Sequence, residues 1–144
     1  HPVTFKNASA GLYRSFNDIE AVSETILQIV LNTKGMIYQL NTLGGAIQSK
    51  EFEAASSFPH RAYPYFSELQ TYWDGEVRGA LLMQRFQEVQ HIIAEHGITA
   101  QYRNYPDINF KNPQEQYYGD SLARLKAVKA KYNGAGLIAQ PQGI

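Results

Sequence analysis

The sequence contains no cysteine among its 144 residues. Disulfide bonds, zinc–thiolate centres and thiol nucleophiles are therefore excluded within this chain. An excess of charge of one sign is also missing, because 13 lysine and arginine residues balance 13 aspartate and glutamate residues. A balanced chain lacks the basic surface that binds nucleic acids or anionic membranes, so we expect neither as a partner.

Long apolar runs and common catalytic motifs are absent as well. The apolar run TILQIVL (25–31) is far too short to span a bilayer. The sequence has no dinucleotide fingerprint, no P-loop and no G-x-S-x-G element. Among the four histidines, His91 and His96 are five residues apart on an expected helix and do not share a face. No metal site is predicted.

Hydrophobic residues and tyrosines are plentiful. The chain is 44% hydrophobic, enough for the core of one domain, and it has 10 tyrosines, which suit surfaces that are both apolar and polar. It opens on HPVTFKN, without an initiator methionine or a visible signal peptide, which favours a processed or cut product. The sequon at Asn7 predicts a glycosylated surface loop in a secreted protein.

Hydrophobic periodicity predicts the secondary structure. Strands are expected over 3–7, 35–43, 65–73 and 98–105, and helices over 16–33, 74–97 and 112–132. Asn17 or Asp18 is the expected cap of the first helix. Since each helix has one apolar stripe, the helices should cover one face of the sheet and leave the other face open.

Gln39 and Asn41 should both point to the open face, because side chains two apart on a strand share a face. Two amides placed together can orient a polar ligand. Strand polar residues that only contact solvent are nevertheless commoner, and the residues alone do not decide between these interpretations.

The stretch QYRNY (101–105) holds the candidate with most chemistry. Alternation along the expected strand places Arg103 and Tyr105 on one face, where a cation lowers the pKa of a phenol from about 10. A phenol tuned in this way can act as a base. Taken alone, the residues favour a simpler interpretation, in which Tyr105 is a half-buried aromatic of a strand.

Three stretches in order carry a resemblance: NTLGGAI with the later FPHRAYPY, then YRNYPD, then YYGDSLARLKAVKAKYN. Together they closely resemble the C-terminal half of berberine-bridge-enzyme-like flavoproteins, which are FAD-linked oxidases of the vanillyl-alcohol-oxidase class. The match runs over roughly residues 36 to 140. It departs at Ser121, where the family commonly has asparagine, and at 133–136, where NGAG replaces Asp-Pro.

The resemblance implies an α+β fold, an antiparallel sheet with helices packed on one face. Residues 1–110 would be a substrate-domain portion, and 111–144 a C-terminal segment of helix and tail that packs on a flavin domain absent from this chain. FAD would be bound mainly by that N-terminal portion, present as a separate chain or uncut. This chain alone is expected to be inactive.

The resemblance also implies chemistry, in which hydride passes from a C–H or alcohol-type small-molecule substrate to flavin, with O2 as the acceptor. Tyr105 would be the catalytic base. Gln39, Asn41 and Arg103 would bind substrate, with one more residue among Ser67, Glu68 and Gln70, of which Gln70 is taken as the prediction. Tyr102 and Asn104 would contact the cofactor. The alternatives are a non-catalytic binding module or a structural subunit derived from the same fold.

Overall fold

The computed structural model describes residues 3–53 and 55–144 of the chain. Its elements are β1 (Thr4–Tyr13), α1 (Phe16–Leu31), β2 (Met36–Thr42), β3 (Tyr65–Trp73), α2 (Glu76–Glu95), α3 (Pro113–Tyr118) and α4 (Leu122–Tyr132). Short 3-10 turns cover Gly45–Gln48, Lys50–Phe52 and Gly119–Ser121. Among the described residues, no helix is both long and apolar enough to cross a membrane.

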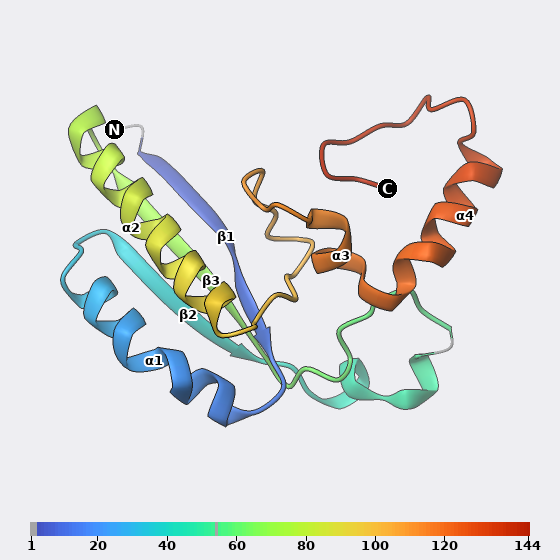
Figure 1. Ribbon diagram of the computed structural model, residues 1–144, viewed down its shortest axis with the longest axis horizontal. Coiled ribbons are helices and arrows are strands. Elements are labelled where there is room, and N and C mark those ends of the chain that lie inside the picture. Colours follow the sequence, from blue (N-terminus) through green and yellow to red (C-terminus); the bar gives the residue numbers. More distant parts are fainter. Residues whose placement is uncertain (1–2, 54) are drawn as a thin grey trace.

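The three strands form one antiparallel sheet in the order β1–β3–β2. Helices α1 and α2 lie side by side over one face of this sheet (Figure 1). Between the helices and the sheet lies a core that includes Ala8, Met36 and Leu69 from the strands, with Ile26 and Phe86 from the helices. The predicted α+β fold, with helices on one face of an antiparallel sheet, is confirmed.

Helix α1 begins with a capping box whose cap, Ser15, lies two residues before the nearer predicted cap, Asn17. The Ser15 hydroxyl accepts from the Asp18 amide at 3.4 Å, and the Asp18 carboxylate accepts from the Ser15 amide at 2.9 Å. Asp18 is therefore the third helical residue and not the cap, and Asn17 lies inside the first turn. Both expected caps are wrong, because Ser15 has the extended backbone that a cap requires.

The strand expected over 98–105 does not form. Register along β1 is broken between Ser9 and Leu12, where Gly11 has a φ of 112°. Two backbone bonds cross to the later segment, from the Leu12 amide to the Ala100 carbonyl and from the Ser9 amide to the Tyr105 carbonyl, at 3.0 and 2.8 Å. The segment between them turns, and the alternation assumed for 101–105 is wrong.

Asn7 lies in the middle of β1 and not in a loop. The strand expected to end at residue 7 continues to Tyr13. The Asn7 amide donates to Glu68 Oε1 at 2.8 Å across the β1–β3 pair. The predicted surface loop at this sequon is therefore wrong.

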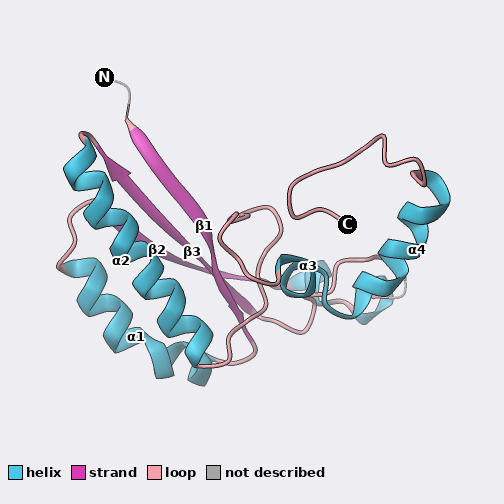
Figure 2. Ribbon diagram, turned by 45° about the horizontal axis from the view of Figure 1, so that its top comes forward, coloured by secondary structure: helices cyan, strands magenta, loops and turns pink. Residues whose placement is uncertain are grey.

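The C-terminal part lies to one side of the sheet (Figure 2). The single helix expected over 112–132 is interrupted at Gly119, whose φ of 45° ends α3. None of the α4 residues is buried, although the stripe expected on this helix includes Val128 and Tyr132. The tail then folds back, and the Gln142 amide donates to the Asp107 carbonyl at 2.6 Å.

Candidate functional site

The sheet face opposite α1 and α2 carries a mixed set of polar and aromatic side chains. Register places Gln39 opposite Glu68 and Asn41 opposite Phe66, on adjacent strands. By strand alternation, the residues of this open face are Phe5, Asn7, Ser9, Ile37, Gln39, Asn41, Phe66, Glu68, Gln70 and Tyr72. We call this set the open face.

Amide groups form part of the open face. The Gln39 side chain donates to Asn41 Oδ1 at 3.0 Å, while the buried Asn41 Nδ2 has no hydrogen-bond partner within 3–53 and 55–144. Gln70 accepts a hydrogen bond from the Tyr72 hydroxyl at 2.8 Å. These three amides can donate to or accept from a ligand that carries hydroxyl groups.

Ser67 and Glu68, the alternatives to Gln70 as a substrate-binding residue, point to opposite faces of the sheet. Ser67 is buried toward the helices, where its hydroxyl donates to the Ala10 carbonyl at 2.9 Å. It is therefore remote from the open face. Glu68 is only 5% exposed and lies on the open face beside Gln70, held by Asn7. The prediction took Gln70 and not Glu68. The two residues are two apart on one strand, and this spacing indicates that both lie on the same face.

Tyr105 lies against an aromatic cluster at one end of the open face. Its ring stacks on Phe66 at a centroid distance of 6.1 Å and meets the Tyr102 ring edge-on at 5.4 Å. These three rings, with Leu43, Ile47, Phe58 and Arg61, line a cavity of about 400 Å³. The stacked rings fix the plane of the phenol next to this cavity.

The pKa of the Tyr105 phenol is raised above its usual value, first by burial, then by the Glu68 carboxylate and by Tyr102. The cation expected to lower this pKa lies elsewhere. Arg103 donates to the Tyr118 hydroxyl at 3.1 Å and to Gln140 Oε1 at 3.0 Å. The prediction that Arg103 shares a face with Tyr105 is wrong, because the chain turns between residues 102 and 105.

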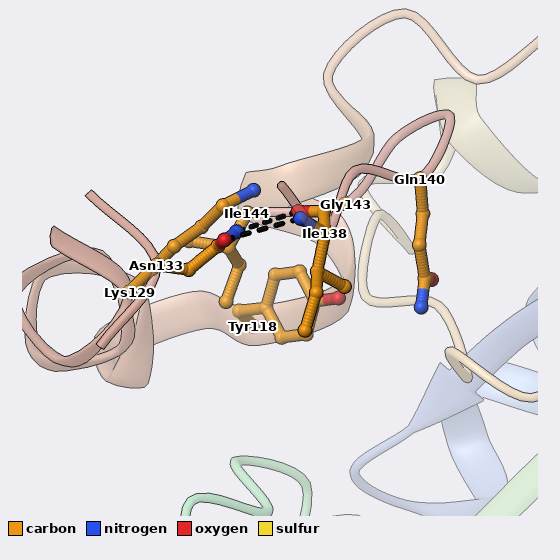
Figure 3. A pocket seen from close by; sticks show the side chains of 7 residues that line it. All are labelled: Tyr118, Lys129, Asn133, Ile138, Gln140, Gly143 and Ile144. Atoms are coloured by element: carbon orange, nitrogen blue, oxygen red, sulfur yellow. Dashed lines mark hydrogen bonds between the residues drawn. The ribbon is translucent and has the colours of Figure 1, made fainter. Parts of the chain in front are cut away.

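Arg103 instead faces the C-terminal tail. Tyr118 and Gln140 line an open cavity of about 260 Å³ between α4 and the tail, where hydrogen bonds join Asn133 to Ile138 (Figure 3). The Arg103 guanidinium also lies 5.2 Å from the centre of the Tyr117 ring. These contacts hold α3 and the tail together and leave Arg103 outside the aromatic cavity.

Tyr102 and Asn104, predicted to contact a cofactor, lie on the same side as Tyr105. Asn104 donates to the Tyr102 hydroxyl at 2.9 Å, and Tyr102 lines the aromatic cavity. The near-parallel rings of Phe66 and Tyr105, with the exposed amide of Asn104, suit a planar heterocycle such as the isoalloxazine ring of FAD. Within the described residues, no three histidine or acidic side chains are grouped so that they could hold a metal ion.

Comparisons with known proteins extend this geometry. The family model for "Berberine and berberine like" matches residues 101–144, the segment that contains Tyr102, Tyr105 and the tail. Residues 101–144 therefore match the C-terminal segment of the berberine-bridge-enzyme-like family.

Two relatives agree with this assignment. A chitooligosaccharide oxidase of Gibberella zeae is 46% identical over 50 residues, which are 33% of this chain and 10% of that protein. The uncharacterized FAD-linked oxidoreductase YvdP of Bacillus subtilis is 26% identical over 124 residues, 86% of this chain and 27% of that protein.

The fold agrees with a solved berberine-bridge-enzyme-like structure. The wild-type BBE-like 1 protein of Physcomitrella patens superposes with a TM-score of 0.81 at 23% identity, over 98% of this chain and 30% of that one. The chain therefore spans less than a third of the length of these three relatives.

Proposed function

We propose that this chain is the substrate-domain portion of an FAD-dependent oxidoreductase that oxidises a C–H or alcohol-type substrate, with O2 as the final acceptor. The observation that carries the proposal is the Tyr105 phenol, which lies at the end of an open face bearing Gln39, Asn41, Glu68 and Gln70. The family match supports the flavin and the oxidoreductase class.

FAD, when bound, supplies a flavin ring that accepts hydride from the substrate. Tyr102 and Asn104 are the residues of this chain that we assign to contact that ring, because both lie beside the aromatic cavity. The remaining contacts are assigned to an N-terminal FAD-binding portion, present as a separate chain or uncut.

Tyr105 Oη is the atom assigned to take the substrate proton. Burial and the Glu68 carboxylate raise the pKa of this phenol, so in this chain alone the neutral, protonated form predominates. A neutral phenol is a poor base. We infer that a group of the flavin-binding portion, such as a tyrosine or a cation, lowers this pKa when the two portions combine.

Gln39, Asn41 and Gln70 are assigned to orient the substrate through its hydroxyl groups, while the Phe66 ring packs against its apolar surface. Amides beside aromatic rings suit a carbohydrate, whose faces present C–H groups and whose edges present hydroxyls. The chitooligosaccharide oxidase relative supports this substrate class. Arg103 is not assigned to substrate binding, because its side chain donates to Tyr118. Asn7 is not assigned as a glycosylation site, because its side chain donates to Glu68.

The test uses the complete protein, with the flavin-binding portion present. We expect a yellow protein that releases H2O2 when a suitable sugar or alcohol is added, and whose flavin bleaches under anaerobic conditions with the same compound. A folded but colourless protein would favour a non-catalytic binding module. A yellow protein whose flavin is never reduced by any sugar or alcohol would exclude the proposed reaction.

A further inference from the structure

Asp107 is a buried carboxylate that contacts three different parts of the chain. Its side chain has 0% exposure and accepts from Lys6 Nζ of β1 at 2.8 Å and from the Gln90 amide of α2 at 2.9 Å. It also accepts from the Asn109 backbone amide at 3.0 Å. The chemistry assigned to the open face does not use this group, so its burial needs another explanation.

Lys6 balances the charge of Asp107 inside the fold. The lysine side chain is 17% exposed, and its ammonium lies 5.0 Å from the centre of the Phe86 ring. A buried ion pair is sensitive to the loss of either partner, because the remaining charge stays without its counter-ion. β1 is therefore firmly joined to residue 107.

The backbone of Asp107 is fixed as well. Its amide donates to the Tyr117 hydroxyl at 3.1 Å, and its carbonyl accepts from the Gln142 side chain at 2.6 Å. Tyr105 is two residues earlier, and Pro106 between them restricts the backbone. A displacement of the Asp107 backbone therefore also displaces the backbone of Tyr105.

β1 holds Tyr105 from both sides. The Ser9 amide donates to the Tyr105 carbonyl at 2.8 Å, and Lys6, three residues earlier on the same strand, holds Asp107. The Tyr105 ring itself stacks on Phe66 and meets the Tyr102 ring edge-on. Stacking fixes the plane of a ring better than its position along the plane, so the backbone anchors decide where the phenol hydroxyl lies.

We propose that Asp107, through its ion pair with Lys6, is a positioning residue that sets the place of the Tyr105 hydroxyl over the open face. The inference rests on the proposed function for its catalytic consequence. Its structural half, the anchoring of the 105–107 backbone to β1, does not depend on any reaction.

The test is a double-mutant cycle in the complete enzyme. Asp107→Asn should slow flavin reduction by about 10- to 100-fold at saturating substrate, since a displacement of about 1 Å can cost that much. In a Tyr105→Phe background, the same substitution should change the rate by less than about twofold, because its effect passes through the tyrosine. Equal slowing in both backgrounds, or no slowing in either, would overturn the proposal.

Gln90→Ala provides a milder variant if Asp107→Asn fails to fold, because it removes a single hydrogen bond to the same carboxylate. Glu88→Gln, two residues away on an exposed part of α2, is the matched control and should leave the rate unchanged. A rate unaffected by Gln90→Ala in a folded enzyme would count against the proposal.

Amide hydrogen exchange separates this proposal from the proposed function. The Ser9 amide, bonded to the Tyr105 carbonyl, should exchange faster in Asp107→Asn, whether or not the enzyme turns over a substrate. Unchanged exchange at Ser9 would overturn the positioning role even in an active enzyme. A wild-type protein without flavin reduction would instead refute the proposed reaction, and the catalytic consequence with it.

Discussion

At the scale of single residues, the Glu68 carboxylate of the open face disfavours ionisation of the Tyr105 phenol beside it. Glu68 and the burial of the ring keep the Tyr105 pKa above its usual value. Arg103, which would have lowered that pKa, is bound to Tyr118 and Gln140. We propose that Tyr105 depends on groups of a flavin-binding portion to act as a base. Within this chain, Glu68 is the charged residue that acts on its pKa.

Removing the charge of Glu68 should shift the pH dependence of the complete enzyme. If the phenolate is the base, flavin reduction becomes faster as pH rises through the Tyr105 pKa. Glu68→Gln removes a negative charge that disfavours the phenolate, so that pKa falls and the rising limb of the profile moves to lower pH. The measurement is the anaerobic rate of flavin reduction across pH, with Glu88→Gln as a distant control. A limb that stays in place, or moves to higher pH, would contradict this account.

At the scale of elements, sequence patterns predict β3 correctly but fail for residues 98–105. The sequence predicts β3 over 65–73, from mixed alternation and a high aromatic content, and the strand is observed there. Residues 98–105 also alternate, but they do not form a ladder of hydrogen bonds with β1, whose register is irregular at Ser9–Leu12. The irregular register of β1 arises from pairing with residues far along the chain, so the local sequence around 98–105 does not reveal it. The sequence therefore predicts a strand at 101–105, and the placement of Arg103 that follows from this strand is wrong.

The capping box of α1 predicts a measurable loss of stability. Ser15→Ala removes the hydroxyl that accepts from the Asp18 amide, and should lower the free energy of unfolding by about 1 kcal/mol. Urea denaturation of the chain measures this change. Ser23→Ala, within the same helix, is the control and should be neutral or slightly stabilising, because alanine is the better helix former. Equal losses for both variants would show that the cap contributes nothing specific.

At the scale of the whole molecule, two surfaces of the described residues lie uncovered. Two helices cover one sheet face, while the open face and α4 remain accessible. Val128 is 46% and Tyr132 75% exposed on the α4 stripe, as the expected packing on a flavin domain requires. The packing of α4 on a flavin domain, which the sequence resemblance implies, stays a prediction.

A charge placed on the α4 stripe should weaken association with the flavin-binding portion. Val128→Asp introduces a carboxylate that would be desolvated at that contact, so the complete protein should lose FAD more readily, by about tenfold or more. Ala127→Asp adds the same charge on a different side of α4, where it stays in water, and serves as the matched control. Flavin release during gel filtration, followed by absorbance, measures the difference. Equal flavin retention by both variants would argue against α4 as the contact.

The assignment of Tyr105 as the base is the central claim, and one substitution tests it most directly. Tyr105→Phe keeps the ring stacked on Phe66 and removes only the hydroxyl. In the complete enzyme, anaerobic stopped-flow should show flavin reduction slowed by about 10²- to 10⁴-fold. Tyr63→Phe, which removes a hydroxyl hydrogen-bonded to Arg14, should reduce flavin at the normal rate. Flavin reduction by Tyr105→Phe at the wild-type rate would contradict the account.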